Sequence, residues 1–364
     1  MSSTLDELIF YCRKDRPAGA LVLFGEPGCG KTWLIEKQLQ EELKDTHFIV
    51  RVSLFGINSI DELHTAVKKQ WLLKLSPLLS KLSSNRVKME KGKSIFEAVS
   101  AIIMALNPQI GTVTDAVTHS LDYLVITPEV EDHVTKEKKK VVLVFDDVDR
   151  SNLNWPELLG SINDYCENQH FNVIIIANRK NFSENDTASA DFIRAAKEKT
   201  VACSVINSPD YCSIVHAIIE ETAWKTEEYS SFIKDHEQDV TELFADDTVI
   251  TTEGASAISR SHNLRSLITG LESFYRIYHH MTAAGIENIN EYFTSFLSFY
   301  LADKSGVIRD GQTSYSFTDE DLKALYPRYS PAFLFECVRK WIRYGYWDEK
   351  QFSEQISSLT QKQS

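Results

Sequence analysis

Short, continuously apolar runs recur in the first part of the chain, each bounded by polar or glycine-rich residues. They lie at Gly19–Gly25 ("GALVLFG"), at Val141–Phe145 ("VVLVF") and within residues 171–180 ("FNVIIIANRK"). A strand that is buried on both faces of a parallel sheet has this pattern, because helices cover it on both sides. We therefore predict an α/β fold whose parallel sheet is sandwiched by helices.

Helical periodicity replaces these runs in the rest of the chain. Apolar residues recur at helical spacing in residues 65–135, which predicts an α-helical insertion that serves either as extra core packing or as a surface for a partner. From residue 207 onward the pattern is almost wholly helical. The predicted domains are a leading helix at 1–16, an α/β core at 17–206, a helical domain at 207–280 and a C-terminal helical region at 281–364.

Composition and charge narrow the class of protein. Of the 364 residues, 43% are hydrophobic and 25% are charged, and the formal net charge is −13. The acidic balance argues against a broad basic surface for nucleic acid or anionic membrane, although a local basic groove stays compatible with it. The six cysteines are scattered, and no stretch resembles a secretory leader or a membrane span, so we expect a cytoplasmic protein that does not bind membranes.

The first apolar run leads into Gly25–Thr32 ("GEPGCGKT") and then into an apolar helical stripe, which together fit the phosphate-binding pattern G-x-x-x-x-G-K-[ST]. Glycines adopt positive φ without strain, so consecutive backbone N–H groups turn inward and hold an anion at the positive end of the helix dipole. Lys31 would then reach the β- and γ-phosphates, and the Thr32 hydroxyl would bind Mg²⁺. The alternative is a glycine-rich turn with a chance lysine. The predicted nucleotide-binding residues are Glu26, Pro27, Gly28, Cys29, Gly30, Lys31, Thr32 and Trp33.

Two acids, Asp146 and Asp147, directly follow the run at Val141–Phe145. In P-loop enzymes the first acid at such a position holds Mg²⁺ and the next polarises the attacking water. We assign Asp146, with Thr32, to the metal and Asp147 to the catalytic base.

Asn178 follows the third apolar run, where an amide would orient the attacking water or contact the γ-phosphate. An ordinary turn asparagine is the alternative. The sequence from Asn178 to Asn181, "NRKN", departs from the guanine-reading pattern Asn-Lys-x-Asp. The expected nucleotide is therefore ATP.

The segments "GEPGCGKT", "VVLVFDDVDR" and "VIIIANRK" resemble Walker A, Walker B and sensor 1 of AAA+-type P-loop NTPases. The double aspartate followed by Val148-Asp149-Arg150 is most similar to the KAP family, relatives of the STAND signalling NTPases, and the likeness covers most of residues 17–280. Many AAA+ proteins carry Asp-Glu where this chain has Asp146-Asp147, which suggests slow, switch-like turnover.

This resemblance also implies residues outside the core motifs. A helical lid at residues 207–280 would carry a sensor 2 arginine, which we assign to Arg265 at the start of an amphipathic helix; a solvated helix arginine is the alternative. An arginine finger would come from a neighbouring subunit. Arg194 is the first candidate for it, with Arg150 and Lys197 behind.

The function implied by the resemblance is a Mg²⁺-dependent ATPase whose nucleotide state controls self-assembly or the activation of a partner, as in KAP-like proteins of bacterial antiviral defence. We expect a homo-oligomer and a separate effector protein, because the sequence carries no nuclease, deaminase or protease constellation of its own. Two alternatives stay open: a nucleotide-binding scaffold with little hydrolysis, and a DNA-handling ATPase such as a transposition or replication accessory.

Overall fold

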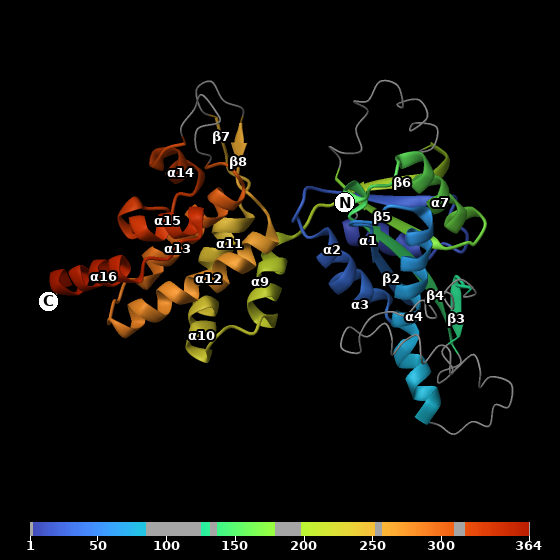
Figure 1. Ribbon diagram of the computed structural model, residues 1–364, viewed down its shortest axis with the longest axis horizontal. Helices are drawn as coiled ribbons and strands as arrows, with labels where there is room; N and C mark the ends of the chain where they lie inside the picture. Colours follow the sequence, from blue (N-terminus) through green and yellow to red (C-terminus); the bar gives the residue numbers. More distant parts are fainter. Residues whose placement is uncertain are drawn as a thin grey trace. The chain divides into compact units, whose positions relative to one another are not determined.

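A computed structural model of the chain describes residues 3–84, 125–131, 137–178, 198–251, 257–308 and 317–363 (Figure 1). Arg194, Lys197 and much of the predicted insertion lie outside these ranges. The chain divides into two compact units, residues 1–27 with 31–208 and residues 28–30 with 209–364. None of the helices in the described ranges is both long enough and apolar enough to cross a bilayer.

The first unit is built on one sheet, to which the described residues contribute six strands in the order β2-β4-β5-β1-β6, with β3 beside β4. The five strands on the main path are all parallel, and β3 is antiparallel to β4. The predicted α/β fold with a parallel sheet is confirmed. The strands are β1 (Ala20–Phe24), β2 (His47–Ser53), β3 (Glu129–Glu131), β4 (Lys138–Asp146), β5 (Asn172–Ala177) and β6 (Val201–Ile206).

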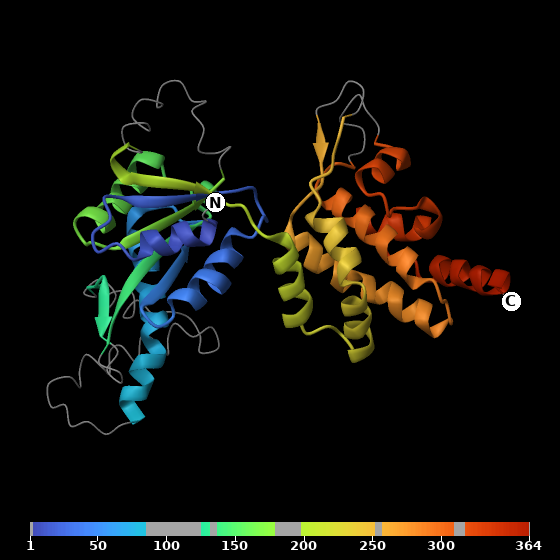
Figure 2. The same ribbon diagram turned by 180° about the vertical axis from the view of Figure 1, so that it is seen from behind.

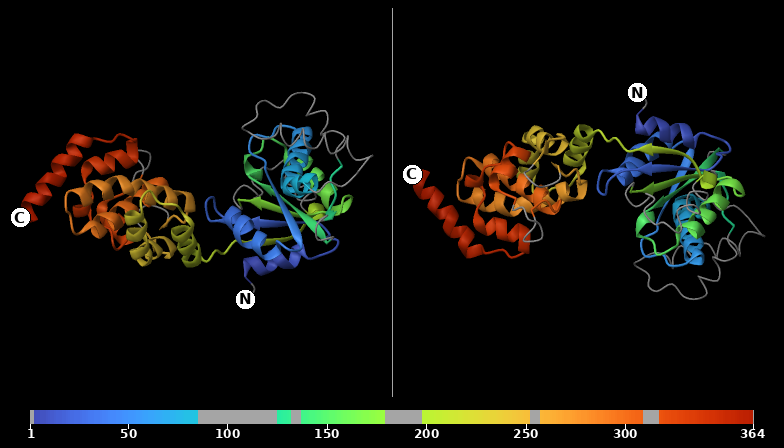
Figure 3. Two further views of the ribbon diagram at one scale, coloured as in Figure 1. Left: turned by 90° about the horizontal axis from the view of Figure 1, so that it is seen from below. Right: turned by 90° about the horizontal axis from the view of Figure 1, so that it is seen from above.

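Alternating side chains of the buried strands enter two separate cores. Leu21 and Leu23 of β1 pack on the face covered by α1 and by the helical segment after β1, whereas Val22 packs on the face covered by α4 and α7. The resulting helix–sheet–helix layers are visible edge-on in Figure 3. The helices of this unit are α1 (Thr4–Cys12), α2 (Lys31–Trp33), the π-helix η1 (Leu34–Leu39), α3 (Gln40–Leu43), α4 (Ile60–Ser84), the 3₁₀ turn η2 (Val148–Arg150) and α7 (Trp155–Glu167).

Strand β3 corrects the predicted helical insertion at residues 65–135. The insertion begins as expected, with α4 running to Ser84, but Glu129–Glu131 is extended. It lies against the lysine-rich start of β4, with Glu129 opposite Lys140. Opposite charges across an antiparallel pair favour this strand, and helical periodicity does not report such cross-strand contacts.

In the described ranges the second unit is a bundle of helices, as the periodicity predicts, with a small hairpin (Figure 2). Its longest helix, α12, begins after Asn263, whose side-chain oxygen accepts hydrogen bonds from Arg265 N and Ser266 N. Helix α13 is buried over most of its length and packs on α12. The helices are α9 (Tyr211–Glu221), α10 (Glu227–Asp235), α11 (Glu237–Ala245), α12 (Leu264–Ala283), α13 (Ile289–Lys304), α14 (Asp319–Leu325), the 3₁₀ turn η3 (Pro331–Phe333), α15 (Glu336–Tyr344) and α16 (Glu349–Gln363), and the hairpin pairs β7 (Val249–Ile250) with β8 (Ile258–Ser259).

Candidate nucleotide-binding site

The loop between β1 and α2 turns on two glycines in left-handed conformations. Gly28 has φ of 81° and Gly30 has φ of 89°, values that an L side chain adopts only with strain. Between them, Cys29 is buried. The loop is anchored where it leaves β1, since Gly25 N donates to the Ala177 carbonyl at the end of β5 at 3.3 Å. Both glycines therefore have the positive φ that the phosphate-binding motif favours.

Lys31, the first residue of α2, folds back over this loop. Its Nζ donates to the carbonyl oxygens of Gly25 at 2.7 Å and Glu26 at 2.9 Å. An ammonium held by two neutral carbonyl oxygens has no counter-charge in these contacts, so an arriving phosphate would be a stronger partner for it. Of the other residues predicted to bind nucleotide, Pro27 lies in the same loop and Trp33 ends α2.

The helix after the loop is π-helical over Leu34–Leu39 before it returns to α-geometry in α3. A π-helix has wider turns than an α-helix, and such segments are frequently found at functional sites. Leu34, Ile35 and Leu39 of this segment are buried against the sheet, while Glu36 points away from that core. The apolar spacing of the sequence predicts a helix here but not this change of period.

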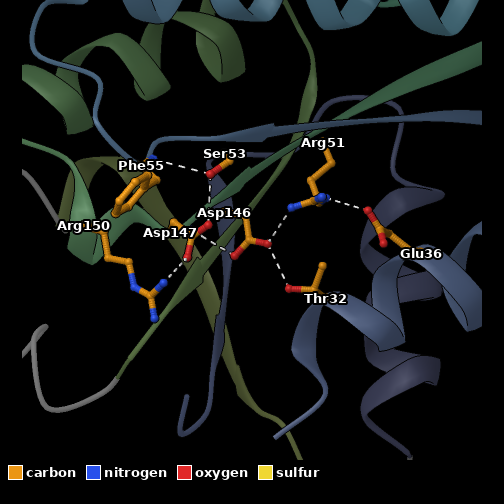
Figure 4. A network of polar contacts seen from close by, with 8 residues as sticks. All are labelled: Thr32, Glu36, Arg51, Ser53, Phe55, Asp146, Asp147 and Arg150. Carbon is orange, nitrogen blue, oxygen red and sulfur yellow. Dashed lines mark hydrogen bonds and ion pairs between the residues drawn. The ribbon is translucent and has the colours of Figure 1, made fainter. Parts of the chain in front are cut away.

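Thr32 and Asp146 contact each other at the carboxyl-terminal edge of the sheet. Thr32 Oγ1 donates to Asp146 Oδ2 at 2.9 Å, although 114 residues separate the two in sequence (Figure 4). Asp146 is 6% exposed, at the end of β4. The contact crosses the sheet, because β5 lies between β4 and β1. It joins the glycine loop to the paired acids, as the phosphate-and-metal hypothesis requires.

Asp147 adopts a left-handed conformation with φ of 55° and ψ of 33°. Its backbone N donates to Asp146 Oδ1 at 2.8 Å, and its own carboxylate accepts from Ser53 Oγ at 2.9 Å. Arg150 Nη1 lies 3.5 Å from the other oxygen, Asp147 Oδ1. Strained backbone of this kind costs about 1–3 kcal/mol and concentrates at functional sites. Here it turns the second carboxylate away from the first and toward the end of β2.

Arg51 of β2 completes a chain of polar contacts. Its Nη1 donates to Asp146 Oδ2 at 3.1 Å, and its Nε donates to Glu36 Oε1 at 2.7 Å. Figure 4 shows Thr32 and Arg51 approaching the same carboxylate oxygen, with Glu36 on the far side of the guanidinium. One side chain thus links the buried acid at the end of β4 to the π-helical segment.

Sequence reasoning missed Arg51, Ser53 and Glu36. The available signal is the strand "HFIVRVS", in which a charged residue interrupts an apolar run and a hydroxyl stands at its carboxyl end. In a parallel sheet the carboxyl ends of the strands share one edge, so a polar residue at the end of β2 lies near the acids that end β4. The contact with Glu36 depends on the π-helical turn and has no sequence signal.

Three further predicted residues, Asn178, Arg265 and Arg150, lie within the described parts of the chain. Asn178 follows the last residue of β5, at the sheet edge where the glycine loop begins, and is partly buried. Arg265 is exposed in the first turn of α12, in the second unit. Arg150, a reserve candidate for the arginine finger, contacts an acid of its own chain. Roles for Asn178, Arg194 and Arg265 stay predictions.

The oxygens at the junction of Thr32 and Asp146 fit a small, hard cation. Mg²⁺ prefers oxygen ligands and usually takes one or two from the protein, with the rest from phosphate and water. Across the described ranges, no cluster of three or more His, Cys, Asp or Glu side chains could hold a metal by itself. The donor set therefore suits a cation that binds together with a nucleotide.

Comparison with known proteins gives an independent finding. Residues 14–184 match the model of a family described as the AAA domain. The matched span contains β1, the glycine loop, and the strands that end at Asp146 and Ala177. No curated protein matches the sequence of the chain. The geometry and this match agree in indicating an AAA-type P-loop NTPase domain within residues 14–184.

Proposed function

We propose that the N-terminal unit binds ATP with Mg²⁺ and hydrolyses it. The observation that carries the proposal is the 2.9 Å hydrogen bond from Thr32 Oγ1 to Asp146 Oδ2. It places a hydroxyl from the phosphate loop and a buried carboxylate within reach of one cation. Asp147 follows Asp146 in sequence, and its carboxylate, held by Ser53 at the end of β2, would serve as the general base for water.

Each side chain of the site has a distinct role in this proposal. The backbone amides of the glycine loop and the Lys31 ammonium hold the phosphates and stabilise the charge that develops on them. Mg²⁺, when bound, neutralises phosphate charge and polarises the bond to be broken. Asp147 accepts the proton of the attacking water, and Ser53 orients that carboxylate through its hydrogen bond.

Two substitutions separate binding from turnover. Lys31→Ala removes the cation from the loop and should abolish binding of a fluorescent ATP analogue. Asp147→Ala should keep that binding but lower Mg²⁺-dependent phosphate release by about 10²–10⁴-fold, the usual contribution of a general base. Lys44→Ala and Asp45→Ala, exposed positions just beyond α3, are matched controls that should leave both readouts unchanged.

The outcomes distinguish the competing functions. Wild type that fails to bind ATP, or Lys31→Ala that binds it normally, contradicts the proposal. ATP binding without Mg²⁺-dependent phosphate release, even at high protein concentration, would favour the scaffold. Salt-sensitive DNA binding at physiological ionic strength would favour a DNA-handling ATPase.

The biological setting proposed for this ATPase comes from the KAP-like resemblance of the sequence. The nucleotide state would control self-assembly and the activation of a separate effector, in the manner of bacterial antiviral ATPases. The family match at residues 14–184 supports the nucleotide-dependent part. Partner and setting rest on analogy with relatives that share the double aspartate after β4.

A further inference from the structure

Arg51 occupies an unusual place for a cation. It stands on β2 with its side chain 33% exposed, and its guanidinium touches the acid that the proposed function assigns to Mg²⁺. Two like charges beside one carboxylate repel each other, and the repulsion is strong where water is partly excluded. The presence of Arg51 therefore affects how readily a divalent cation binds there.

The hydrogen bonds of Asp146 show where Arg51 and a divalent cation would compete for the same carboxylate. Its Oδ1 accepts from Asp147 N at 2.8 Å, and its Oδ2 accepts from both Thr32 Oγ1 and Arg51 Nη1. A carboxylate has about four lone-pair sites, so three are occupied. The Thr32 contact is compatible with metal binding at the hydroxyl oxygen, because the hydroxyl proton points to the carboxylate. The Arg51 contact places positive charge on the oxygen that a hydrated cation would approach.

Glu36 offers Arg51 a second position. The Arg51 Nε contact to Glu36 is 2.7 Å, shorter than the 3.1 Å contact to Asp146. An open pocket of about 280 Å³ adjoins this side of the guanidinium, lined among others by Glu36, Gln40 and Gln70. The pocket supplies space for a guanidinium that leaves Asp146 and keeps its bond to Glu36.

Lys74, which lines the same pocket, shows that its wall is partly shielded from water. Its Nζ donates to Gln40 Oε1 at 2.9 Å, and burial lowers the pKa of the ammonium. Glu36 is the acid among the lining residues and the main attraction for a cation that moves into the pocket.

We propose that Arg51 is a built-in counter-cation that competes with Mg²⁺ for Asp146, and that Glu36 draws it away when Mg²⁺ and nucleotide bind. This inference rests on the proposed function, because it assumes that Mg²⁺ binds at Asp146 with ATP. It makes Arg51 and Glu36 positioning residues with opposite effects on the affinity for Mg²⁺: Arg51 weakens it and Glu36 strengthens it. A residue that only oriented Asp146 for the metal would instead weaken Mg²⁺ binding when removed.

The test measures the free Mg²⁺ concentration that gives half-maximal binding of a fluorescent, non-hydrolysable ATP analogue, with affinity in EDTA as the baseline. Arg51→Gln should lower this midpoint by about three- to tenfold, since a nearby positive charge is lost. Glu36→Gln should raise it by a similar factor, because Arg51 then has only Asp146 as an acid partner. The double variant should behave as Arg51→Gln, since Glu36 acts through Arg51.

Controls keep the outcomes distinct. Arg51→Lys retains the charge and should have a midpoint near that of wild type. Glu41→Gln alters an exposed acid on α3 that pairs with Lys44 and should leave the midpoint unchanged.

Shifts in the same direction for Arg51→Gln and Glu36→Gln, or no shift in either, would overturn the inference. Wild type that binds no nucleotide in Mg²⁺ or EDTA would instead contradict the proposed function. Glu36 is half exposed, so its variant tests the idea even where Arg51→Gln does not fold.

Discussion

At the residue scale, the site separates two adjacent acids by backbone conformation. The left-handed φ of Asp147 turns its carboxylate toward Ser53, while Asp146 continues β4 and faces Thr32. Two carboxylates that are neighbours in sequence thereby acquire different partners. This conformation costs aspartate less free energy than it costs most other residues, because aspartate tolerates left-handed backbone better.

Ser53→Ala tests the orientation of the second acid. Loss of a hydrogen bond to a charged group costs about 1.5–3 kcal/mol, which corresponds to a fall of about tenfold or more in kcat. Binding of ATP should change little, because Ser53 Oγ contacts the carboxylate of Asp147 rather than the glycine loop.

Steady-state phosphate release at saturating Mg²⁺ and ATP measures this effect. Ser151→Ala is the matched control, since its hydroxyl donates to the Val148 carbonyl at 3.0 Å in the same loop. If Ser53→Ala and Ser151→Ala lost kcat equally, the loss would reflect general disturbance of the loop that follows Asp147, and not loss of the hydrogen bond from Ser53 to Asp147.

At the element scale, the periodicity of the sequence predicted the helices and strands whose side chains are buried in the core. Strands β1, β4 and β5 are apolar on both faces, so their existence follows from composition alone. The π-helical turn of η1 and strand β3 could not be predicted from periodicity, because Glu36 of η1 contacts Arg51 on β2 and β3 depends on its pairing with the start of β4. The pairing of Thr32 with Asp146 was predicted because both residues belong to recognised motifs. Arg51 belongs to no such motif, so its contact with Asp146 was missed.

Helix α1 is tied to the sheet by one buried hydroxyl. Tyr11 Oη donates to the Gly19 carbonyl at 2.9 Å and accepts from Val173 N at 3.0 Å. Tyr11→Phe would leave both backbone groups buried without this partner, and each such loss costs about 1–3 kcal/mol. The free energy of unfolding in urea should fall accordingly.

Tyr346→Phe is the matched control for this prediction, since Tyr346 is 69% exposed and its hydroxyl can be replaced by water contacts. Urea unfolding of the two variants at one pH compares the same chemical change at a buried and an exposed position. A Tyr11→Phe variant as stable as the control would show that α1 does not depend on this bond.

At the scale of the whole molecule, one buried and one partly buried histidine, His47 and His64, make stability depend on pH. Burial lowers the pKa of His47, which contacts the Cys12 carbonyl at 3.0 Å, and of His64, which contacts Tyr165 Oη at 2.6 Å. The unfolded chain therefore binds protons that the folded chain does not, and stability is lost as the pH falls below about 6.5 toward the folded values.

Thermal unfolding at pH 7.5 and pH 5.5 tests this. The Tm of wild type should drop on acidification, and the drop should be smaller in His47→Gln, because a neutral side chain takes up no proton on unfolding. His279→Gln, an exposed position on α12, is the control. A drop of equal size in wild type and His47→Gln would assign the pH dependence to other groups.

Self-assembly, part of the proposed function, predicts a change in mass. Native mass measurement with a saturating non-hydrolysable ATP analogue should show a larger species than the nucleotide-free protein, and Lys31→Ala should not respond. An unchanged monomer in wild type under these conditions would contradict both the oligomer and an arginine finger supplied by a second copy.

The order of strands in the sheet has a consequence for synthesis of the protein. Strand β1 is made early, yet its two neighbours are β5 and β6, which begin at Asn172 and Val201. At about 5–20 residues per second, a ribosome leaves this apolar segment without a neighbouring strand for roughly 7 to 30 s. The nascent chain therefore exposes an apolar strand until β5 has been made, and we expect the glycine loop that follows β1 to fold only after β5 and β6 have emerged.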